Sequence, residues 1–501
     1  MTQMKKLSFI TGLMLSLCIS CGDKMPENGK EDETPGTGTD VEAPGSSIGL
    51  GDAPSYMHPG YYETAKKSTA DSSCVGRMVS AFPVSAALLS DGNRQYVAFY
   101  DGLHQMTIAQ RALPTGAWKY CKLDEYIDWD PHNYITMTKN AQGCILISGN
   151  MHADPLVLFS TDESGEISTL RRIEPVVDPA KETSATYPKF SLLADGRLIF
   201  HFRDGKSGDG VEVYYIQNAD GSFSSYLDTP LIDGRAGGYN MSAYMTEPAM
   251  GPDGNYHMVW VWRDSGNADT CHDLSYAYSP DLKTWYGADG NQVSLPIDFT
   301  MKQLIVDPVP VRGGINNSGL SLGFDAQKRP LVGYYKFDEN GYTNVYIARL
   351  ENGNWNIKKV TDLEWRWDFT GTGTLIKQFT IGAPVLEEDG EITIWYRRYE
   401  EDGTKIEGKE CWLDPTTLEV NLVQNERSKV SEYQDWSRKV TTPYSGEGRL
   451  VVNYSKDLGS ATSGAKYYLK WDSLPNNRDT KPTVTLPEAS KLWVSKCLPA
   501  L

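Results

Sequence analysis

The chain has 501 residues, among them 46 Gly, 29 Tyr and 13 Trp, and its formal net charge is −17. Its apolar segments are short and alternating, a pattern typical of many strands joined by tight turns and not of helices. The negative charge argues against nucleic acid or an anionic membrane surface as the main partner, because a negative field attracts neither. An anionic sugar held by a locally basic pocket stays possible.

Residues 1–20 are typical of a secretion signal, with Lys5 and Lys6 before an apolar run that is short for a membrane span. The small Ser20 directly before Cys21 resembles the processing site of a bacterial lipoprotein. We therefore expect an exported protein, periplasmic or at the cell surface, that meets the outer membrane only through a lipid anchor on Cys21. The alternative is ordinary cleavage nearby, which also gives an exported protein.

Residues 21–48 are expected to form the lipidated cysteine and a flexible linker. Between Gly22 and Pro44 the chain is rich in Gly, Pro, Asp and Glu and shows no apolar periodicity, so it cannot bury enough surface to fold. Residues 49–501 are then the folded domain. Its six Cys are scattered and include no CxxC pair, which favours buried thiols or one or two disulfides over a disulfide framework.

One pattern recurs along the folded domain: an apolar pair, a short turn usually containing Asp or Gly, and an alternating strand rich in Tyr, Val, Ile and Trp. Seven copies follow one another at a spacing of roughly fifty to seventy residues, close to that of blade-like repeats. Because a two-stranded hairpin is marginal alone, the units must pack around a shared axis. The copies cover Leu88–Gly102, Thr138–Asn150, Leu192–Gly205, Met250–Asp264, Phe324–Asp338, Leu386–Tyr399 and Tyr444–Asp457.

The repeats predict an all-β, single-domain, seven-bladed β-propeller, with six or eight blades as alternatives because repeats are hardest to count at the termini. The segment SPDLKTW, Ser279–Trp285, resembles the Asp-box turn of sialidase-type propellers, in which Asp and Trp stabilise a hairpin away from the active site. This segment marks the fold and does not indicate sialidase chemistry.

Four side chains suited to uronic acid chemistry occur in three successive repeats. His132 and His152 lie in polar turns beside Asn133 and Asn150, where propeller loops on one face surround one funnel. Arg203 follows an alternating strand and could offer a planar fork to a carboxylate, although a salt bridge with Asp204 or Asp209 is the alternative. Tyr187 precedes Pro188 and is expected to have an extended backbone, with its phenol in the core or in the pocket.

These residue types suit β-elimination from a uronic acid. A cation paired with the carboxylate stabilises the charge that develops as the C5 proton leaves, and His and Tyr can act as base and acid. No metal-ligand spacing such as HExxH is present, so we expect neither a metal nor another cofactor. A hydrolase would need two carboxylates at a defined separation. Asp128, Asp130 and Asp154 are available but are typical of turns.

Several segments resemble the BNR-repeat seven-bladed propeller polysaccharide lyases, which include ulvan lyases, L-rhamnose-α-1,4-D-glucuronate lyases that act on arabinogalactan, and related α-L-rhamnosidases. The resemblance runs from about Tyr96 to Trp285, and beyond Trp285 only the repeat rhythm continues. It is carried by YVAFYDG, MTIAQR, DPHNYITM, SGNMH, YPKF, FRDGKSGDG, YMTEPAMGPDG and HMVWVWRD followed by HDLSYAYSPDLKTW.

The resemblance implies that Arg203 neutralises the uronate carboxylate while His132 and Tyr187 form the base and acid pair. Which of the two takes the proton stays open, because it depends on the sugar's configuration at C5. His152 and Tyr244 would line the same pocket, and we place Asn133 and Asn150 with them as substrate-binding residues. The expected partner is a polysaccharide or oligosaccharide that contains uronic acid.

We expect cleavage of the bond between L-rhamnose and D-glucuronate, with removal of rhamnose caps from arabinogalactan. The first alternative is an ulvan lyase with the same site, for which sulfate recognition would need basic residues such as Lys189, Lys206 and Arg235. A second is an α-L-rhamnosidase acting from another face through an early histidine, for which His58 is the candidate.

A third alternative is a glycan-binding lipoprotein without catalytic activity. Its sugar platforms would be aromatic residues such as Trp260 and Trp262, although alternating Trp residues in a strand are usually core. Some ulvan lyases carry a structural zinc near the stretch that resembles HDLSY. The adjacent Cys271 and His272 are a poor tetrahedral pair without further ligands, so no metal is expected there.

Overall fold

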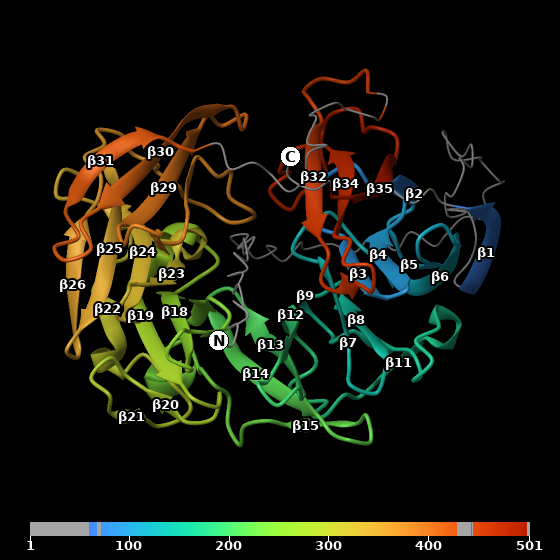
Figure 1. Cartoon of the computed structure of the whole chain (residues 1–501), viewed down its shortest axis with the longest axis horizontal. Coiled ribbons are helices and arrows are strands. Elements are labelled where there is room, and N and C mark those ends of the chain that lie inside the picture. Colours follow the sequence, from blue (N-terminus) through green and yellow to red (C-terminus); the bar gives the residue numbers. More distant parts are fainter. Residues whose placement is uncertain (1–59, 68–71, 428–441, 443, 498–501) are drawn as a thin grey trace, which may run out of the picture.

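The computed structural model describes residues 60–67, 72–427, 442 and 444–497. These residues form seven β-sheets that follow one another around a ring in chain order (Figure 1). The predicted seven-bladed, all-β propeller is therefore confirmed. The few helical turns are 3-10 helices in loops: η1 (Ile167–Thr169), η2 (Ala236–Gly238), η3 (Ala268–Thr270), η4 (Lys302–Leu304) and η5 (Asn317–Gly319).

The first three blades carry the strands that surround the candidate site. Blade 1 contains β3 (Ala87–Gly92), β4 (Arg94–Tyr100), β5 (Gln105–Ala112) and β6 (Ala117–Tyr126), with β1 (Gly60–Lys67) beside β6 and β33 (Ser460–Ala461) beside β3. Blade 2 contains β7 (Ile135–Lys139), β8 (Ile145–Gly149), β10 (Leu158–Ser160) and β11 (Arg171–Arg172). Blade 3 contains β9 (His152–Asp154), β12 (Ala185–Leu192), β13 (Leu198–Lys206), β14 (Asp209–Gln217) and β15 (Phe223–Ser225).

The remaining four blades complete the ring. Blade 4 contains β16 (Ser242–Met245), β17 (Ala249–Met250), β18 (Tyr256–Arg263), β19 (Cys271–Ser279), β20 (Trp285–Tyr286), β21 (Gln292–Val293) and β22 (Ile305–Asp307). Blade 5 contains β23 (Ser321–Phe324), β24 (Pro330–Phe337), β25 (Thr343–Glu351) and β26 (Asn354–Lys359). Blade 6 contains β27 (Phe379–Ile381), β28 (Val385–Leu386), β29 (Ile392–Tyr399), β30 (Lys405–Leu413) and β31 (Val420–Asn425). Blade 7 contains β32 (Val451–Lys456), β34 (Tyr467–Ser473), β35 (Ser490–Lys496) and β2 (Ser72–Met78).

Each of the seven predicted repeats lies in a different blade, and the turn chemistry explains why the hairpins form. Gly196, Gly254 and Gly390 each follow an Asp and have φ angles of 85°, 89° and 90°, a region that glycine enters without steric cost. The preceding Asp accepts a backbone hydrogen bond two residues on, as in Asp195 to Arg197 at 3.1 Å. The Asp-Gly pairs therefore set where the inner strands of blades 3, 4 and 6 turn.

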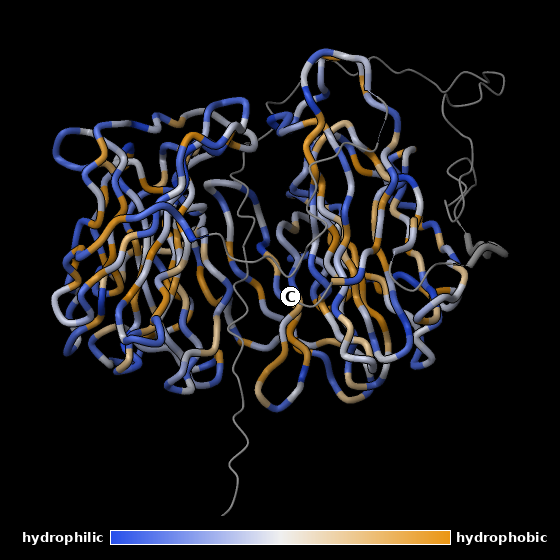
Figure 2. Tube along the Cα trace, turned by 45° about the horizontal axis from the view of Figure 1, so that its top comes forward, coloured by the Kyte–Doolittle hydropathy of each residue, from blue (hydrophilic) through white to orange (hydrophobic). Residues whose placement is uncertain are grey.

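The core lies between the blades. Strand β18 is buried at every position, because both faces of an inner strand pack against neighbouring blades, whereas most of the outer strand β31 is exposed. Trp260 and Trp262 on β18 are 0% and 2% exposed, so they are core residues and not sugar platforms. Figure 2 shows hydrophobic residues along the strands and hydrophilic residues in many of the loops.

The ring is closed by pairing the first and last parts of the folded chain. Strand β2 pairs with β35 over six positions, from Ser72 opposite Ser495 to Met78 opposite Ser490. The Arg77 guanidinium also donates to the Ala489 carbonyl oxygen at 2.9 Å, across 412 positions of the sequence. Blade 7 therefore exists only when both ends of the domain are present.

The predicted Asp-box is confirmed as a turn-stabilising element. The Asp281 carboxylate accepts the backbone N–H groups of Lys283 and Thr284 at 2.8 and 2.7 Å, and Trp285 is fully buried. In the described part of the domain, Cys121, Cys144, Cys271 and Cys411 are free thiols.

Other sequence predictions lie outside the described residues. They are the signal at 1–20, the lipidated Cys21 with its linker, and His58. The domain boundary at residue 49 lies there too, so these stay predictions. Among the residues that the structure does describe, no helix is long and apolar enough to cross a membrane.

Candidate functional site

Two consecutive turns between blades 1 and 2 place His132. The Asp128 carboxylate accepts the backbone N–H of Asp130 at 2.9 Å, and the Asp130 carboxylate accepts the backbone N–H of His132 at 2.8 Å. Short side chains that cap backbone groups two residues on are the reason Asp favours such turns. The His132 side chain is buried, and these two local hydrogen bonds set the course of the backbone at His132.

His152 reaches the same place just after β8, because Ile135 at the start of β7 pairs with Gly149 at the end of β8. Its strand β9 pairs with β12 of blade 3, with His152 opposite Thr186. The rings of His132 and His152 stack, with centroids 4.4 Å apart and an interplanar angle of 27°. The centroid of the Tyr187 ring lies 6.1 Å from that of His132 and 6.0 Å from that of His152. The structure therefore brings these three predicted residues together.

The backbone of Tyr187 differs from the prediction. An extended conformation was expected before Pro188, but φ is 58°, in the left-handed region. The register of β12 against β13 shifts between Thr186 and Lys189, so a bulge overrides the local preference and turns the phenol toward the histidines. Asn150 and Ala153 also have φ angles of 62° and 65°. Strained non-glycine residues that cluster in this way are typical of functional sites.

Arg203 adds a guanidinium group beside these three rings. It lies on β13 opposite Thr186 and is 1% exposed. Its guanidinium carbon is 4.9 Å from the centre of the Tyr187 ring and 5.2 Å from that of Tyr244, on β16. The guanidinium carbon of Arg263 is 5.1 Å from the centre of the same Tyr244 ring. Two guanidinium groups and two phenols thus continue the row that the histidines begin.

The two carboxylates close to Arg203 in the sequence have a basic partner in Arg235. Arg235 donates to Asp209 at 2.5 Å and to Asp204 at 3.3 Å, and a salt bridge between Arg203 and either carboxylate stays the alternative. Gly210 leaves room for the arginine, because a Cβ atom at this position would lie 2.7 Å from Arg203 Cδ. The strand β14 therefore carries glycine where the arginine stem crosses it.

The two predicted asparagines are placed differently. Asn133 is 6% exposed, and its amide donates to Asp128 at 3.3 Å. Among the described residues its Oδ1 has no hydrogen-bond partner. The Asn150 amide donates to Glu125 at 2.8 Å, so this side chain holds the neighbouring loop. Tyr244 shares a 2.6 Å hydrogen bond with the Ser207 hydroxyl. Substrate binding by these residues stays a prediction.

Two carboxylates at the site were missed by sequence reasoning. Asp130, interpreted as a turn residue, is 2.5 Å from His132 Nδ1 through one oxygen and 2.6 Å from His152 Nδ1 through the other. Asp479, in the loop between β34 and β35, has an oxygen 3.6 Å from His132 Nδ1. The side-chain amide of Asn477 from this loop donates to the Trp129 carbonyl at 2.5 Å, so blade 7 contributes to the site.

Arg263 could have been found from the sequence. It ends the strand of YHMVWVWRD as Arg203 ends that of LIFHFRD, so the two arginines hold equivalent positions in successive repeats. Asp479 carries no comparable signal, because its neighbour His132 comes from a distant part of the chain, and Asp130 has the sequence surroundings of an ordinary turn residue.

One set of side chains could hold a metal ion. Asp130, His132 and His152 offer three ligand atoms within 4.8 Å of one another, and no other such set of three occurs in the described residues. Imidazole and carboxylate suit several divalent metals. At Cys271 and His272, by contrast, both ring nitrogens of His272 lie 3.0 Å from carboxylates, those of Asp264 and Asp273. The absence of a metal stays a prediction.

A second buried charge network lies beside Arg203 on β13. His201 Nε2 is 2.7 Å from the Glu212 carboxylate, and its Nδ1 is 3.6 Å from that of Glu247. Lys189 is 2.8 Å from Glu247. Burial alone lowers the pKa of His201, but the two glutamates outweigh burial and raise this pKa to about 9. His201 is therefore a structural cation that helps hold β12, β13 and β14 together.

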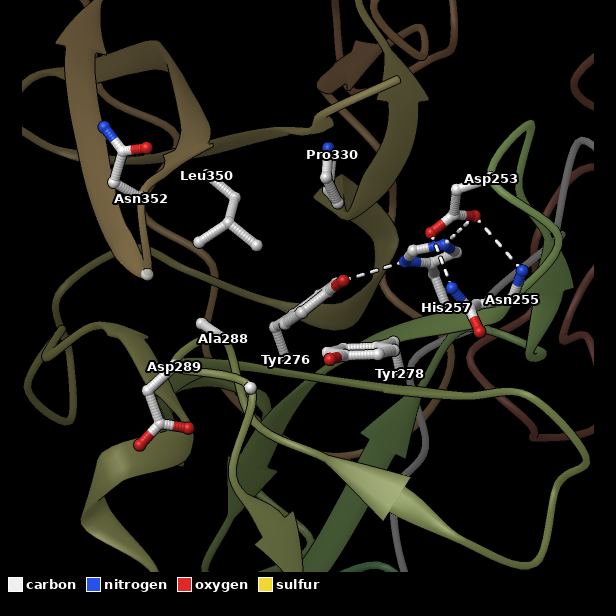
Figure 3. A pocket seen from close by; sticks show the side chains of 12 residues that line it. Asp253, Asn255, His257, Tyr276, Tyr278, Ala288, Asp289, Pro330, Leu350 and Asn352 are labelled. Carbon is white, nitrogen blue, oxygen red and sulfur yellow. Dashed lines mark hydrogen bonds and ion pairs between the residues drawn. The ribbon is translucent and has the colours of Figure 1, made fainter. Parts of the chain in front are cut away.

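A cavity of about 380 Å³ lies between blades 4 and 5 and is lined by neither His132 nor His152. Figure 3 shows Tyr276 and Tyr278 along it, with the His257 ring held between the Tyr276 hydroxyl and the Asp253 carboxylate. Asp253 and Asp289 contribute negative charge, and none of the lining residues is Lys or Arg. This cavity does not suit a uronate, because it offers no Lys or Arg side chain to a carboxylate.

The fold is similar to that of solved polysaccharide lyases. The crystal structure of polysaccharide lyase Uly1 has a TM-score of 0.51 at 14% identity, over 83% of this chain and 90% of that chain. Two structures of a PL25 ulvan lyase, one of them bound to -[GlcA(1-4)Rha3S]-, each have a TM-score of 0.49 at 14% identity. They cover 86% and 84% of this chain, and 95% and 94% of their own. At this identity the likeness shows the fold.

A search of curated proteins by sequence gives no match. The model of a BNR repeat-containing family, by contrast, matches residues 94–363. The match spans more than half of the chain and includes blades 2, 3 and 4, with His132, His152, Tyr187 and Arg203. The chain therefore belongs to the BNR repeat-containing family.

Proposed function

We propose that the protein is a polysaccharide lyase that cleaves the bond between L-rhamnose and D-glucuronate by β-elimination. The observation that supports it is the row of two imidazoles, a phenol and a buried guanidinium, formed by His132, His152, Tyr187 and Arg203. It supplies every group that elimination from a uronate needs: a cation for the carboxylate, a base and an acid. The fold shared with polysaccharide lyase Uly1 agrees with this chemistry.

In the proposed reaction, Arg203 binds the glucuronate carboxylate and stabilises the negative charge that develops next to C5. The base removes the C5 proton, the C–H electron pair becomes the C4–C5 double bond, and the C4–O bond breaks. The acid then gives a proton to the departing oxygen. His132 and Tyr187 share these two roles, and His152, Tyr244, Asn133 and Asn150 bind the sugar.

We infer that the substrate is an arabinogalactan in which unsulfated rhamnose caps the glucuronate. Of the three basic residues considered for sulfate, Lys189 is paired with Glu247 and Arg235 with Asp204 and Asp209. Ion-paired cations are less available to a sulfate group, which favours arabinogalactan over ulvan. We further infer that the protein acts outside the cytoplasm as a lipoprotein anchored through Cys21.

The test is digestion of gum arabic arabinogalactan, with ulvan in parallel, followed by released rhamnose and by the ultraviolet absorbance of a C4–C5 double bond. Rhamnose together with absorbance is the expected result. Rhamnose without absorbance would mean hydrolysis and would move the activity to another face and to His58. Absorbance with ulvan alone would keep the site and change the substrate, and no product from either would favour glycan binding without catalysis.

The assignment of the site is tested by Tyr187→Phe, which removes only the hydroxyl. We expect turnover to fall on the order of 10²- to 10⁴-fold, the usual contribution of a general acid or base, with unchanged circular dichroism. Tyr126→Phe, at an exposed tyrosine of blade 1, is the matched control and should keep full activity. Full activity of Tyr187→Phe would show that another group transfers the proton.

A further inference from the structure

A single buried carboxylate holds both histidines of the candidate site. The Oδ1 atom of Asp130 is 2.5 Å from His132 Nδ1, and its Oδ2 atom is 2.6 Å from His152 Nδ1. Asp130 is 4% exposed, and its own backbone N–H is fixed by Asp128. The two rings are stacked on each other, so they leave the carboxylate in the same direction.

The ionisation state of Asp130 decides which ring nitrogens carry protons. Burial disfavours the charged carboxylate, but the imidazoles of His132 and His152 outweigh burial and hold the pKa of Asp130 well below its usual range. An ionised carboxylate only accepts hydrogen bonds. Each Nδ1 atom must therefore carry the proton of its hydrogen bond, and in a neutral ring the lone pair is then on Nε2.

We propose that Asp130 is a positioning residue that holds His132 and His152 in one tautomer, with Nδ1 protonated, so that Nε2 is the nitrogen through which each ring exchanges a proton. The inference rests on the proposed function for the use of Nε2. The geometry itself does not depend on that function. Asp130 does not touch the sugar and acts only through the two rings.

Other charged groups around the rings fit this arrangement. The Asp479 carboxylate lies 3.6 Å from the same His132 Nδ1, which further favours a proton on that atom. The guanidinium carbon of Arg203 lies 4.9 Å from the centre of the Tyr187 ring. Negative charge thus faces the Nδ1 atoms, and the positive charge of Arg203 lies beside Tyr187.

The substitution Asp130→Asn separates this role from a general structural one. An amide offers one oxygen that accepts and one NH₂ group that donates. One imidazole can keep its proton on Nδ1, while the other must accept at Nδ1 and move its proton to Nε2. Asp130→Glu keeps two accepting oxygens but adds a methylene group, so it should displace the rings and preserve the tautomer.

The tautomers are read from two-bond ¹⁵N–¹H correlation spectra of the full chain labelled at histidine, with His132→Gln and His152→Gln used to assign the signals. We expect Nδ1–H for both rings in the wild type, and one ring with Nε2–H in Asp130→Asn. Turnover should fall on the order of 10²- to 10⁴-fold in Asp130→Asn. In Asp130→Glu turnover should fall without a change of tautomer.

A matched control is Glu182→Gln, which changes another buried carboxylate. Glu182 accepts backbone N–H groups of Val176 and Val177 at 2.9 and 2.6 Å, away from the histidines. It should leave the tautomers and the rate of the folded protein unchanged. If circular dichroism shows that Asp130→Asn is unfolded, the spectra of the wild type and of Asp130→Glu test whether Asp130 sets the histidine tautomers.

Three results would overturn the inference: wild-type rings with Nε2–H, unchanged tautomers in folded Asp130→Asn, or one equivalent of a metal bound through Nδ1 in the purified protein. Wild-type protein that shows the expected tautomers but cleaves neither polysaccharide would refute the proposed function instead. The assignment of Asp130 as the residue that sets the tautomers would then still hold.

Discussion

The guanidinium carbon of Arg203 lies 4.9 Å from the centre of the Tyr187 ring. The two residues lie on the paired strands β13 and β12, and Tyr187 lies at the bulge in β12. A cation held against the face of a phenol is attracted by the ring quadrupole, and the planar guanidinium can also bind a carboxylate with two parallel hydrogen bonds. The two side chains therefore fix each other and the place where a uronate carboxylate would bind.

Replacing Arg203 by Lys tests this geometry while keeping the positive charge. Because an ammonium group cannot reproduce the planar fork or the stacking, we expect kcat/KM on a uronate substrate to fall on the order of 10²- to 10³-fold. Arg197→Lys is the control, since Arg197 is exposed on blade 3 and paired with Asp195. An activity of Arg203→Lys within about twofold of the wild type would mean that the positive charge alone sustains turnover and that the planar shape of the guanidinium is not needed.

Gly210→Ala should disturb the site without removing a functional group. The new Cβ atom would lie 2.7 Å from Arg203 Cδ and 2.9 Å from Cγ, so the arginine stem must move. A displacement of about 1 Å at a catalytic group can cost on the order of 10²-fold in rate. Steady-state kinetics of Gly210→Ala, Arg203→Lys and the double variant check the mechanism. If the fold-losses in rate of the two single variants multiply in the double variant, Gly210→Ala acts independently of Arg203 and not by displacing its stem.

The network around His201 predicts how stability depends on pH. The folded-state pKa of His201 is raised from 6.5 to about 9. Its charge therefore stabilises the fold fully below pH 6.5, and this contribution is lost as the pH rises through about 9. Burial disfavours ionised Glu247, but Lys189 and His201 outweigh burial and lower its pKa below 4.5, so its contribution is lost on acidification.

Urea denaturation of the wild type and of His201→Gln checks this prediction. The free energy of unfolding of the wild type should exceed that of the variant by on the order of 1 to 3 kcal/mol at about pH 6. The difference should shrink as the pH is raised past about 9. A difference that is equal at both pH values would show that the imidazolium contributes through packing alone.

Removal of divalent metals tests the histidine pair in another way. If Asp130 accepts hydrogen bonds from His132 and His152, the two Nδ1 atoms and the carboxylate are paired with one another without a metal. Dialysis against a chelator should then leave the initial rate of cleavage unchanged. Loss of activity that returns when one metal is added back would show that these residues are ligands. Elemental analysis of the purified protein, compared with His152→Gln, gives the metal content directly.

The fold could be predicted because its signals are local. Each repeat carries its own turn, as Asp195 and Gly196 do in blade 3, and an alternating strand that cannot be buried in isolation. The convergence of His132, His152 and Arg203 follows from the same repeats, since loops at equivalent ends of adjacent blades meet on one face. These parts of the site need only the number and order of the blades.

The rest of the site depends on contacts that no local pattern records. A bulge in β12 gives Tyr187 a positive φ angle, against the preference of a residue before proline. Asp130 has the sequence surroundings of an ordinary turn residue, and only the folded chain shows that its second oxygen reaches His152. Asp479 follows His132 by more than three hundred positions and comes from blade 7, beyond the segment in which the resemblance is specific.

The pairing of β2 with β35 also sets a time order for synthesis. Arg77 and its partner Ala489 are 412 positions apart, and at ribosomal rates of about 5 to 20 residues per second, roughly 20 to 80 s pass between their emergence. Throughout this interval β2 is an unpaired edge, which is a hazard for aggregation. The loop that carries Asp479 is made within a few seconds of Ala489, so a nascent chain becomes a complete ring and gains a complete site together.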